Sequence, residues 1–91
     1  MREFEIKLES NKKLIKLSKK DKSRYEFIIK KIEEIINSNN IEHYKNLRYD
    51  MKESKRVHIG HFVLVFSYDN KQDFLCFEYF DHHDKIYLKR F

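Results

Sequence analysis

The stretch YEFIIKKIEEII, residues 25–36, carries the clearest structural signal in this chain of 91 residues. Its apolar residues fall at i, i+3, i+4, i+7, i+10 and i+11: Tyr25, Ile28, Ile29, Ile32, Ile35 and Ile36. This spacing predicts one continuous apolar stripe along an α-helix of about four turns. We expect Asp21 or Ser23 to cap the start of the helix, and the polar run NSNN at 37–40, with an asparagine in a left-handed cap, to end it.

Two further elements are expected before this helix. In EFEIKL, residues 3–8, apolar and charged residues alternate, which predicts a strand with one buried face. A short helix containing Leu14, Ile15 and Leu17 follows, with Ser10 or Asn11 as its N-cap. The chain then pauses at 20–22, so the two helices are consecutive.

After the long helix the apolar period changes to that of strands. KRVHIG at 55–60 alternates, and Arg56 and His58 are expected on one face. HFVLVFSY at 61–68 is almost wholly apolar and predicts a central strand covered on both faces, and FLCFEYF at 74–80 predicts the next strand beyond a turn at 69–73. The expected fold is α+β, a single domain over 1–91 with two N-terminal helices on one face of a small four-stranded, mainly antiparallel sheet in the order β-α-α-β-β-β.

Composition restricts the class of protein. The net charge of +5 favours polyanionic partners. No apolar run approaches the roughly 18 residues that cross a bilayer, so no membrane partner is expected. The single cysteine, Cys76, excludes an internal disulfide and is expected to be a small buried hydrophobe. These features indicate a cytoplasmic protein.

The stretch FDHHDKIY, residues 80–87, admits three interpretations. A metal site is disfavoured because no HxxxH or CxxC spacing is present and because adjacent residues of an extended chain, such as His82 and His83, point to opposite faces. A solvated turn after the last strand is the commoner outcome for such a segment. A catalytic site is the third, since histidine exchanges protons near neutral pH.

The segment from residue 45 to residue 87 resembles the C-terminal half of the RelE/ParE toxin superfamily. A basic loop leads into the strand RVHIG, an apolar strand and a hairpin follow, and the segment ends in DHHDKIY. The resemblance implies a RelE-like mRNA interferase, a ribosome-dependent endonuclease that cuts mRNA by metal-independent attack of a ribose 2′-hydroxyl. It also implies no cofactor and a cognate antitoxin protein, with which the toxin can form a hetero-oligomer.

The resemblance also indicates site residues. Arg56 matches the family arginine of the first strand in this half, His82 the histidine of the terminal motif, and Tyr87 the terminal tyrosine, while His83 stands where better-known members have a catalytic arginine. His58 is a further catalytic candidate. Four basic residues are expected to bind RNA phosphates: Arg48, Lys52, Lys55 and Lys85.

Two further expectations concern recognition. Tyr49 or Phe62 is expected to stack an RNA base, and Leu14 or Ile15 together with Ile41 to form the antitoxin groove. The family's second strand arginine is missing, because Gly60 is followed by His61, Phe62 and Val63. Two alternatives therefore stay open: a ParE-like inhibitor of DNA gyrase, and a catalytically impaired homologue that acts as a binding module.

Overall fold

A computed structural model describes residues 2–44 and 54–88, the last three of these as backbone only. The elements are the strands β1 (Glu3–Ile6), β2 (Ser54–Ile59), β3 (Phe62–Asp69) and β4 (Phe74–His82), the helices α1 (Leu8–Lys20), α2 (Lys22–Ile36) and α3 (His83–Leu88), and the 3-10 turn η1 (Ile41–His43). The expected order of strand, two helices and three strands is confirmed. The terminal helix α3 and the turn η1 were not expected from the sequence.

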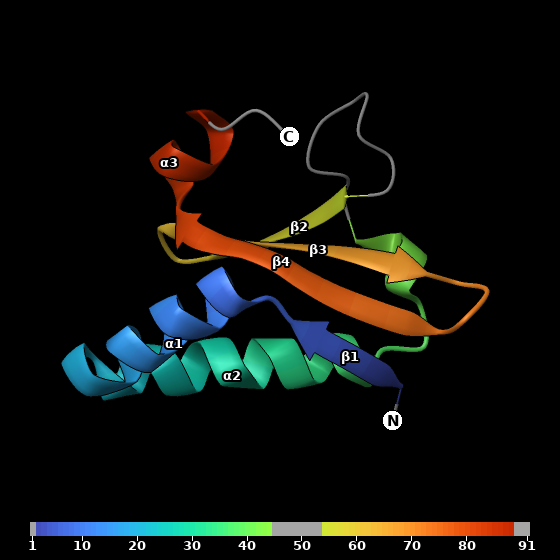
Figure 1. Cartoon of the computed structure of the whole chain (residues 1–91), viewed down its shortest axis with the longest axis horizontal. Coiled ribbons are helices and arrows are strands. Elements are labelled where there is room, and N and C mark those ends of the chain that lie inside the picture. Colours follow the sequence, from blue (N-terminus) through green and yellow to red (C-terminus); the bar gives the residue numbers. More distant parts are fainter. Residues whose placement is uncertain (1, 45–53, 89–91) are drawn as a thin grey trace.

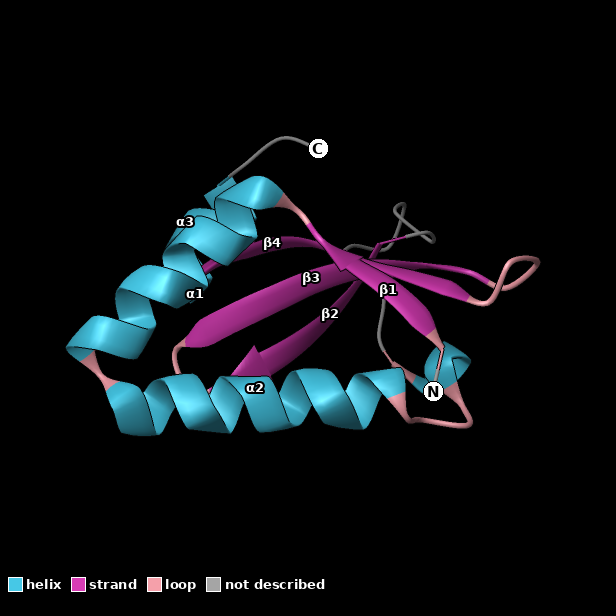
Figure 2. Cartoon of the chain, turned by 60° about the horizontal axis from the view of Figure 1, so that its bottom comes forward, coloured by secondary structure: helices cyan, strands magenta, loops and turns pink. Residues whose placement is uncertain are grey.

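The sheet has the strand order β1-β4-β3-β2. The pairs β2–β3 and β3–β4 are antiparallel, whereas β1 pairs with β4 in parallel. The helices α1 and α2 lie together on one side of the sheet, and α3 rises on the other side (Figure 1). Figure 2 shows α1 and α2 as two arms joined by a short loop. The predicted architecture is thus correct, with one parallel pair in a mainly antiparallel sheet.

The core lies between these two helices and the sheet. Ile28, Ile32, Ile35 and Ile36 of α2 are buried, as the apolar stripe predicts. They share one cluster with Leu64, Phe66, Leu75, Phe77 and Phe80 of the two central strands. Residues 63–66 of β3 are all buried, which confirms a central strand covered on both faces.

The helix ends differ in part from expectation. Asp21 caps α2, because its Oδ1 accepts a hydrogen bond from the Arg24 amide at 3.2 Å. At the other end Asn37 keeps right-handed helical angles, so the expected left-handed cap is wrong. Arg2 donates hydrogen bonds to carbonyl oxygens at this end of the helix: its Nη1 lies 2.8 Å from the Ile36 carbonyl oxygen and 2.6 Å from that of Ser38. A side chain from the other end of the sequence thereby satisfies the last carbonyls of α2.

The start of α1 is also earlier than expected. The helix begins at Leu8, and its N-cap Lys7 makes no capping hydrogen bond through its side chain. Ser10 therefore lies inside the helix, where it is buried, and its hydroxyl donates to the Glu78 carbonyl oxygen of β4 at 2.9 Å. The N-cap assignment to Ser10 or Asn11 is wrong because Ser10 joins the helix to the sheet instead.

A β-bulge at Glu78 decides which way the end of β4 faces. Val65 of β3 pairs with Tyr79, while the next residue of β3, Phe66, pairs with Phe77, so Glu78 is one additional residue in β4. Phe77 before the bulge and Phe80 after it both point into the core. Since side chains alternate along a strand, the bulge reverses the alternation for every residue that follows.

Candidate functional site

Arg56, His58 and His83 come together on the side of the sheet away from α1 and α2. Arg56 and His58 are two residues apart on β2, and Nη1 of Arg56 lies 2.8 Å from Nε2 of His58. The ring of His58 lies 5.6 Å, centroid to centroid, from the ring of His83, the first residue of α3. The expectation that Arg56 and His58 share a face is confirmed. We call these three residues the Arg–His–His cluster.

The hydrogen bond within the cluster fixes the form of His58. A guanidinium group has only donors, so Nε2 of His58 must accept the hydrogen bond from Arg56. His58 is therefore neutral in this arrangement, with its proton on Nδ1. A neutral imidazole beside an arginine is the form that can take up a proton from a substrate that the arginine binds.

His83 has an acidic neighbour. Its Nδ1 lies 3.2 Å from Oδ1 of Asp84, which is the distance of a hydrogen bond to a carboxylate. A carboxylate in this position holds the imidazole in one orientation. The two histidines of the cluster thus have different surroundings, an arginine for His58 and a carboxylate for His83.

His82 points away from the cluster. Its ring stacks on that of His61 at 6.1 Å and meets the edge of Phe62 at 5.9 Å. The sequence argument that His82 and His83 diverge holds in the structure, because His82 ends β4 and pairs with Phe62. Of the two adjacent histidines, only His83 contacts His58.

Asp81 anchors the turn from β4 into α3. Its Oδ1 accepts the His82 amide at 2.8 Å, and its Oδ2 lies 2.6 Å from Nζ of Lys13 on α1. Burial acts to raise the pKa of the Asp81 carboxyl, but the hydrogen bonds from Lys13 and from the His82 amide outweigh it and lower the pKa. An ionised, half-buried carboxylate therefore ties the residue before His82 to α1.

Two of the predicted phosphate-binding residues, Lys55 and Lys85, can be placed in the structure. Lys55 precedes Arg56 and points to the opposite side of β2, where it is buried and its Nζ lies 3.3 Å from the Tyr44 carbonyl oxygen and 3.7 Å from Glu42. Lys85 is exposed on α3. Arg48 and Lys52 lie outside the described residues.

The remaining predicted residues are placed as follows. Tyr87 lies in α3, but its side chain is outside the described part of the chain, as is all of Tyr49. The Phe62 ring is stacked on Phe80 at 5.0 Å and lies under the Arg24 guanidinium at 5.4 Å, so it already serves packing within the chain.

Two expectations about apolar residues need correction. Leu14 and Ile41 are buried in the core and cannot line a groove, whereas Ile15 is 48% exposed. Cys76 is partly exposed, because it falls on the sheet face opposite the core. Its burial, with Glu78 and Glu5 nearby, nevertheless raises the pKa of the thiol.

One residue near the site escaped sequence reasoning. Tyr79 pairs with Val65, which in turn pairs with Arg56, so Tyr79 and Arg56 lie on the same face two strands apart. Simple alternation along FLCFEYF places Tyr79 with Phe77 on the core side, and only the bulge at Glu78 turns it outward. No signal in the sequence marks that bulge.

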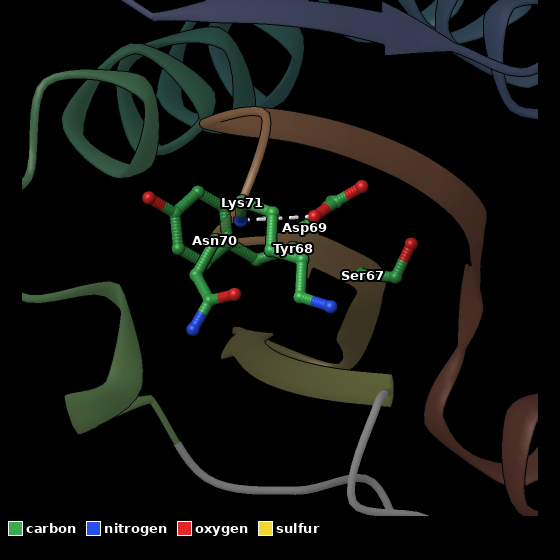
Figure 3. Close-up of a pocket in the computed structure, with 5 residues that line it drawn as sticks. All are labelled: Ser67, Tyr68, Asp69, Asn70 and Lys71. Carbon is green, nitrogen blue, oxygen red and sulfur yellow. Dashed lines mark hydrogen bonds between the residues drawn. The ribbon is translucent and has the colours of Figure 1, made fainter.

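Two hollows deserve comparison with the cluster. A cleft of about 480 Å³ between α1, the ends of β3 and β4, and α3 is lined by Lys13, Lys16, Leu17, Lys20, Phe62, Phe80, Asp81 and Lys85. A second hollow, of about 470 Å³, lies at the β3–β4 hairpin, where the Lys71 amide donates to Asp69 (Figure 3). The hairpin hollow contains none of the predicted site residues.

Within the described residues, no three histidine, cysteine, aspartate or glutamate side chains converge in a way that could hold a metal ion. None of the described helices is long and apolar enough to cross a membrane.

The fold and cluster define a class: a small α+β protein with two helices under a four-stranded sheet and a basic, histidine-containing open face. No protein-family model matches the sequence. Among solved structures, Escherichia coli YafQ has a TM-score of 0.62 at 17% identity over 96% of this chain and 99% of that one. A chain from the crystal structure of the toxin–antitoxin complex RelBE2 of Mycobacterium tuberculosis has a TM-score of 0.58 at 15% identity, over 89% of this chain and 90% of that one. These two likenesses concern the fold.

A sequence relative identifies the family. A Methanocaldococcus jannaschii protein named "Putative toxin RelE4" is 50% identical over 91 residues, 99% of this chain and 95% of its own length. The chain therefore belongs to the RelE family of toxins, the toxin components of toxin–antitoxin systems. The resemblance drawn from the segment 45–87 is confirmed.

Proposed function

We propose that this toxin is a ribosome-dependent mRNA endonuclease and that the Arg–His–His cluster is its catalytic centre. The observation that carries the proposal is the approach of Arg56, His58 and His83 to one another on the sheet face away from α1 and α2. One arginine and two histidines supply the three functions that phosphodiester cleavage needs: charge stabilisation, a base and an acid.

The proposed reaction is an in-line transesterification. The ribose 2′-oxygen attacks phosphorus as its proton passes to a base, and the bond from phosphorus to the 5′-oxygen breaks as that oxygen takes a proton from an acid. The products are a 2′,3′-cyclic phosphate and a 5′-hydroxyl end. Arg56 would hold the phosphate oxygens on which negative charge develops.

The contacts of the histidines support a division of roles. When Arg56 turns to a phosphate, its hydrogen bond to His58 breaks, and Nε2 of His58 can then accept the 2′-hydroxyl proton. His83, oriented by its contact with Asp84, would give a proton to the 5′-oxygen. Tyr87 remains a candidate orienting hydroxyl, and Arg48 and Lys52 remain predicted phosphate ligands.

The test compares two adjacent histidines. His83→Ala and His58→Ala are expected to lower mRNA cleavage in a translating extract by two to four orders of magnitude, the usual contribution of a general acid or base. His82→Ala is the matched control, because His82 is the neighbouring residue but contacts His61 and Phe62 instead of the cluster. If folded His58→Ala and His83→Ala proteins cleave as fast as the parent, the catalytic assignment is wrong.

A cognate antitoxin is the proposed protein partner. The structural relative from M. tuberculosis is described as part of a toxin–antitoxin complex. An acidic antitoxin would complement the net charge of +5. Co-purification from a strain that expresses this chain with its neighbouring gene tests the proposal.

The ParE-like alternative predicts a different target. A gyrase inhibitor would block DNA supercoiling with or without the two histidines, whereas the nuclease would leave supercoiling unaffected and produce mapped cuts in mRNA. The other alternative is an impaired toxin that acts as a binding module. It is favoured by the missing arginine after Gly60, where the family has its second strand arginine. That possibility predicts RNA binding with no cleavage by the parent protein.

A further inference from the structure

The lysine cleft between α1 and the end of the sheet is not part of the Arg–His–His cluster. It is lined by Lys13, Lys16 and Lys20 of α1 and by Lys85 of α3, with Asp81 as the acidic residue. Four lysines and one aspartate give the lining a net charge of +3 at neutral pH. Such a concentration of one sign of charge in a cleft attracts an oppositely charged ligand.

The α1 lysines form a regular row. Lys13, Lys16 and Lys20 stand at i, i+3 and i+7, so they occupy one face of the helix. The row is about 10 Å long, because an α-helix rises 1.5 Å per residue. Their aliphatic stems and Leu17 form the walls of the cleft, while the ammonium groups can reach its rim. A row of this length suits the repeated charges of a polynucleotide backbone.

The cleft is joined to the proposed catalytic centre through one residue. Asp81 binds Lys13 on the cleft side and the His82 amide at the start of the turn that leads to His83. Lys85, two residues beyond His83, lies on the cleft. The helix α3 therefore carries both a catalytic candidate, His83, and part of the cleft lining, Lys85.

We infer that this cleft is an extended binding track for the phosphate backbone of the single-stranded RNA substrate, outside the catalytic centre. This inference rests on the proposed function for the identity of the strand. The track recognises phosphates without reading bases, since the Phe62 ring beside the lysines is already packed against Phe80 and Arg24. It adds affinity, and not chemistry, to the reaction.

The test measures binding of a fluorescent 12-nucleotide 2′-O-methyl RNA, which lacks the attacking hydroxyl and cannot be cut. The double variant Lys16→Gln/Lys20→Gln removes two predicted phosphate contacts. Each phosphate contact to single-stranded nucleic acid contributes about 0.7 to the slope of the logarithm of the binding constant against the logarithm of the salt concentration. Loss of two contacts should therefore make this slope shallower by about 1.4 and weaken binding at 0.1 M salt about 25-fold.

Lys12→Gln/Lys19→Gln is the matched control, because it removes the same charge from the same helix at residues that do not line the cleft. It should weaken binding by less than about threefold, the effect of net charge alone. His83→Ala should bind the uncleavable RNA like the parent, so a failure of the catalytic assignment would leave this measurement intact.

Three results would overturn the inference. Equal weakening by both double variants would show that only net charge matters. Unchanged RNA binding by the cleft variant, with weaker binding of a polyglutamate peptide, would assign the cleft to an acidic protein. Unchanged binding of the oligonucleotide with loss of co-sedimentation with ribosomes would assign it to ribosomal RNA.

Discussion

Replacing Ser10 by alanine tests how α1 holds the bulge in β4. The Ser10 hydroxyl is buried and donates to the Glu78 carbonyl oxygen at 2.9 Å. Glu78 is the additional residue of the bulge and has no partner in the β3–β4 register. Ser10→Ala therefore leaves a carbonyl oxygen at the bulge without this donor.

The expected magnitude follows from that loss. A buried acceptor left without a partner costs about 1–3 kcal/mol, partly offset by the better helix propensity of alanine, about 0.5 kcal/mol. Ser18→Ala is the control, since Ser18 is on the same helix and donates only to the nearby Ile15 carbonyl on the exposed side. It gains the same propensity, so the difference between the two variants isolates the bond to Glu78.

Urea unfolding followed by circular dichroism provides the measurement. The free energy of unfolding of Ser10→Ala should fall below that of Ser18→Ala by about 1–3 kcal/mol, which corresponds to a lower Tm by at least about 4 °C for a domain of this size. The slope of the unfolding curve should not change. If the two variants unfold within about 0.3 kcal/mol of each other, Ser10 does not support the bulge and the reasoning is refuted.

Three further predictions concern contacts that cannot be predicted from the sequence. Arg2→Ala should lower the free energy of unfolding by about 1.5–3 kcal/mol in urea titrations, because the last carbonyls of α2 lose a charged donor. Removing the exposed ion pair between Arg24 and Asp21 is the control and should cost less than about 1 kcal/mol. Equal costs for the two changes would contradict the role of Arg2 as a cap. Hydrogen bonds from Tyr68 and Arg2 lower the pKa of Asp73, so its contribution to stability is present above its unfolded pKa and is lost as the pH falls through the folded pKa. Asp73→Asn should therefore remove part of the acid-dependent loss of stability below about pH 4, and identical pH profiles would refute this contribution. Because the thiol pKa of Cys76 is raised by burial and by nearby carboxylates, iodoacetamide should modify it more slowly at pH 8 than an unstructured cysteine, and equal rates would argue against that environment.

Much of the fold is predictable because its signals are local. The apolar stripe of 25–36 specifies both the helix and its core-facing side. Four of its isoleucines are buried, and Tyr25 and Ile29 are partly buried against the same core. The apolar run in 61–68 specifies an interior strand for the same reason, since only a strand covered on both sides tolerates it. Periodicity and burial agree in these two elements, but not in EFEIKL at 3–8, where the predicted buried face is wrong: Phe4 is 41% exposed, and Leu8 is 66% exposed and begins α1.

Contacts between distant segments are less predictable. Arg2 caps a helix that ends 34 residues later in the sequence, and Ser10 reaches a strand 68 residues away. Both residues appear in the sequence as ordinary polar positions of a strand start and a helix start. Their roles follow from the parallel pairing of β1 with β4 and from the position of α1 on β4, which no local pattern encodes.

The bulge connects these distant contacts to the site. Continuous alternation from Phe77 would place residues 79, 81 and 83 on the core side, and His82 would then face β2 with Arg56 and His58. The additional residue at Glu78 exchanges the two histidines, so that His83 meets His58 and His82 packs by His61 and Phe62. The sequence motif can name both histidines as candidates, but the choice between them depends on one residue of register. The hydroxyl of Ser10 on α1 therefore bears on which histidine lies beside His58, because it binds Glu78, the residue at which the register changes.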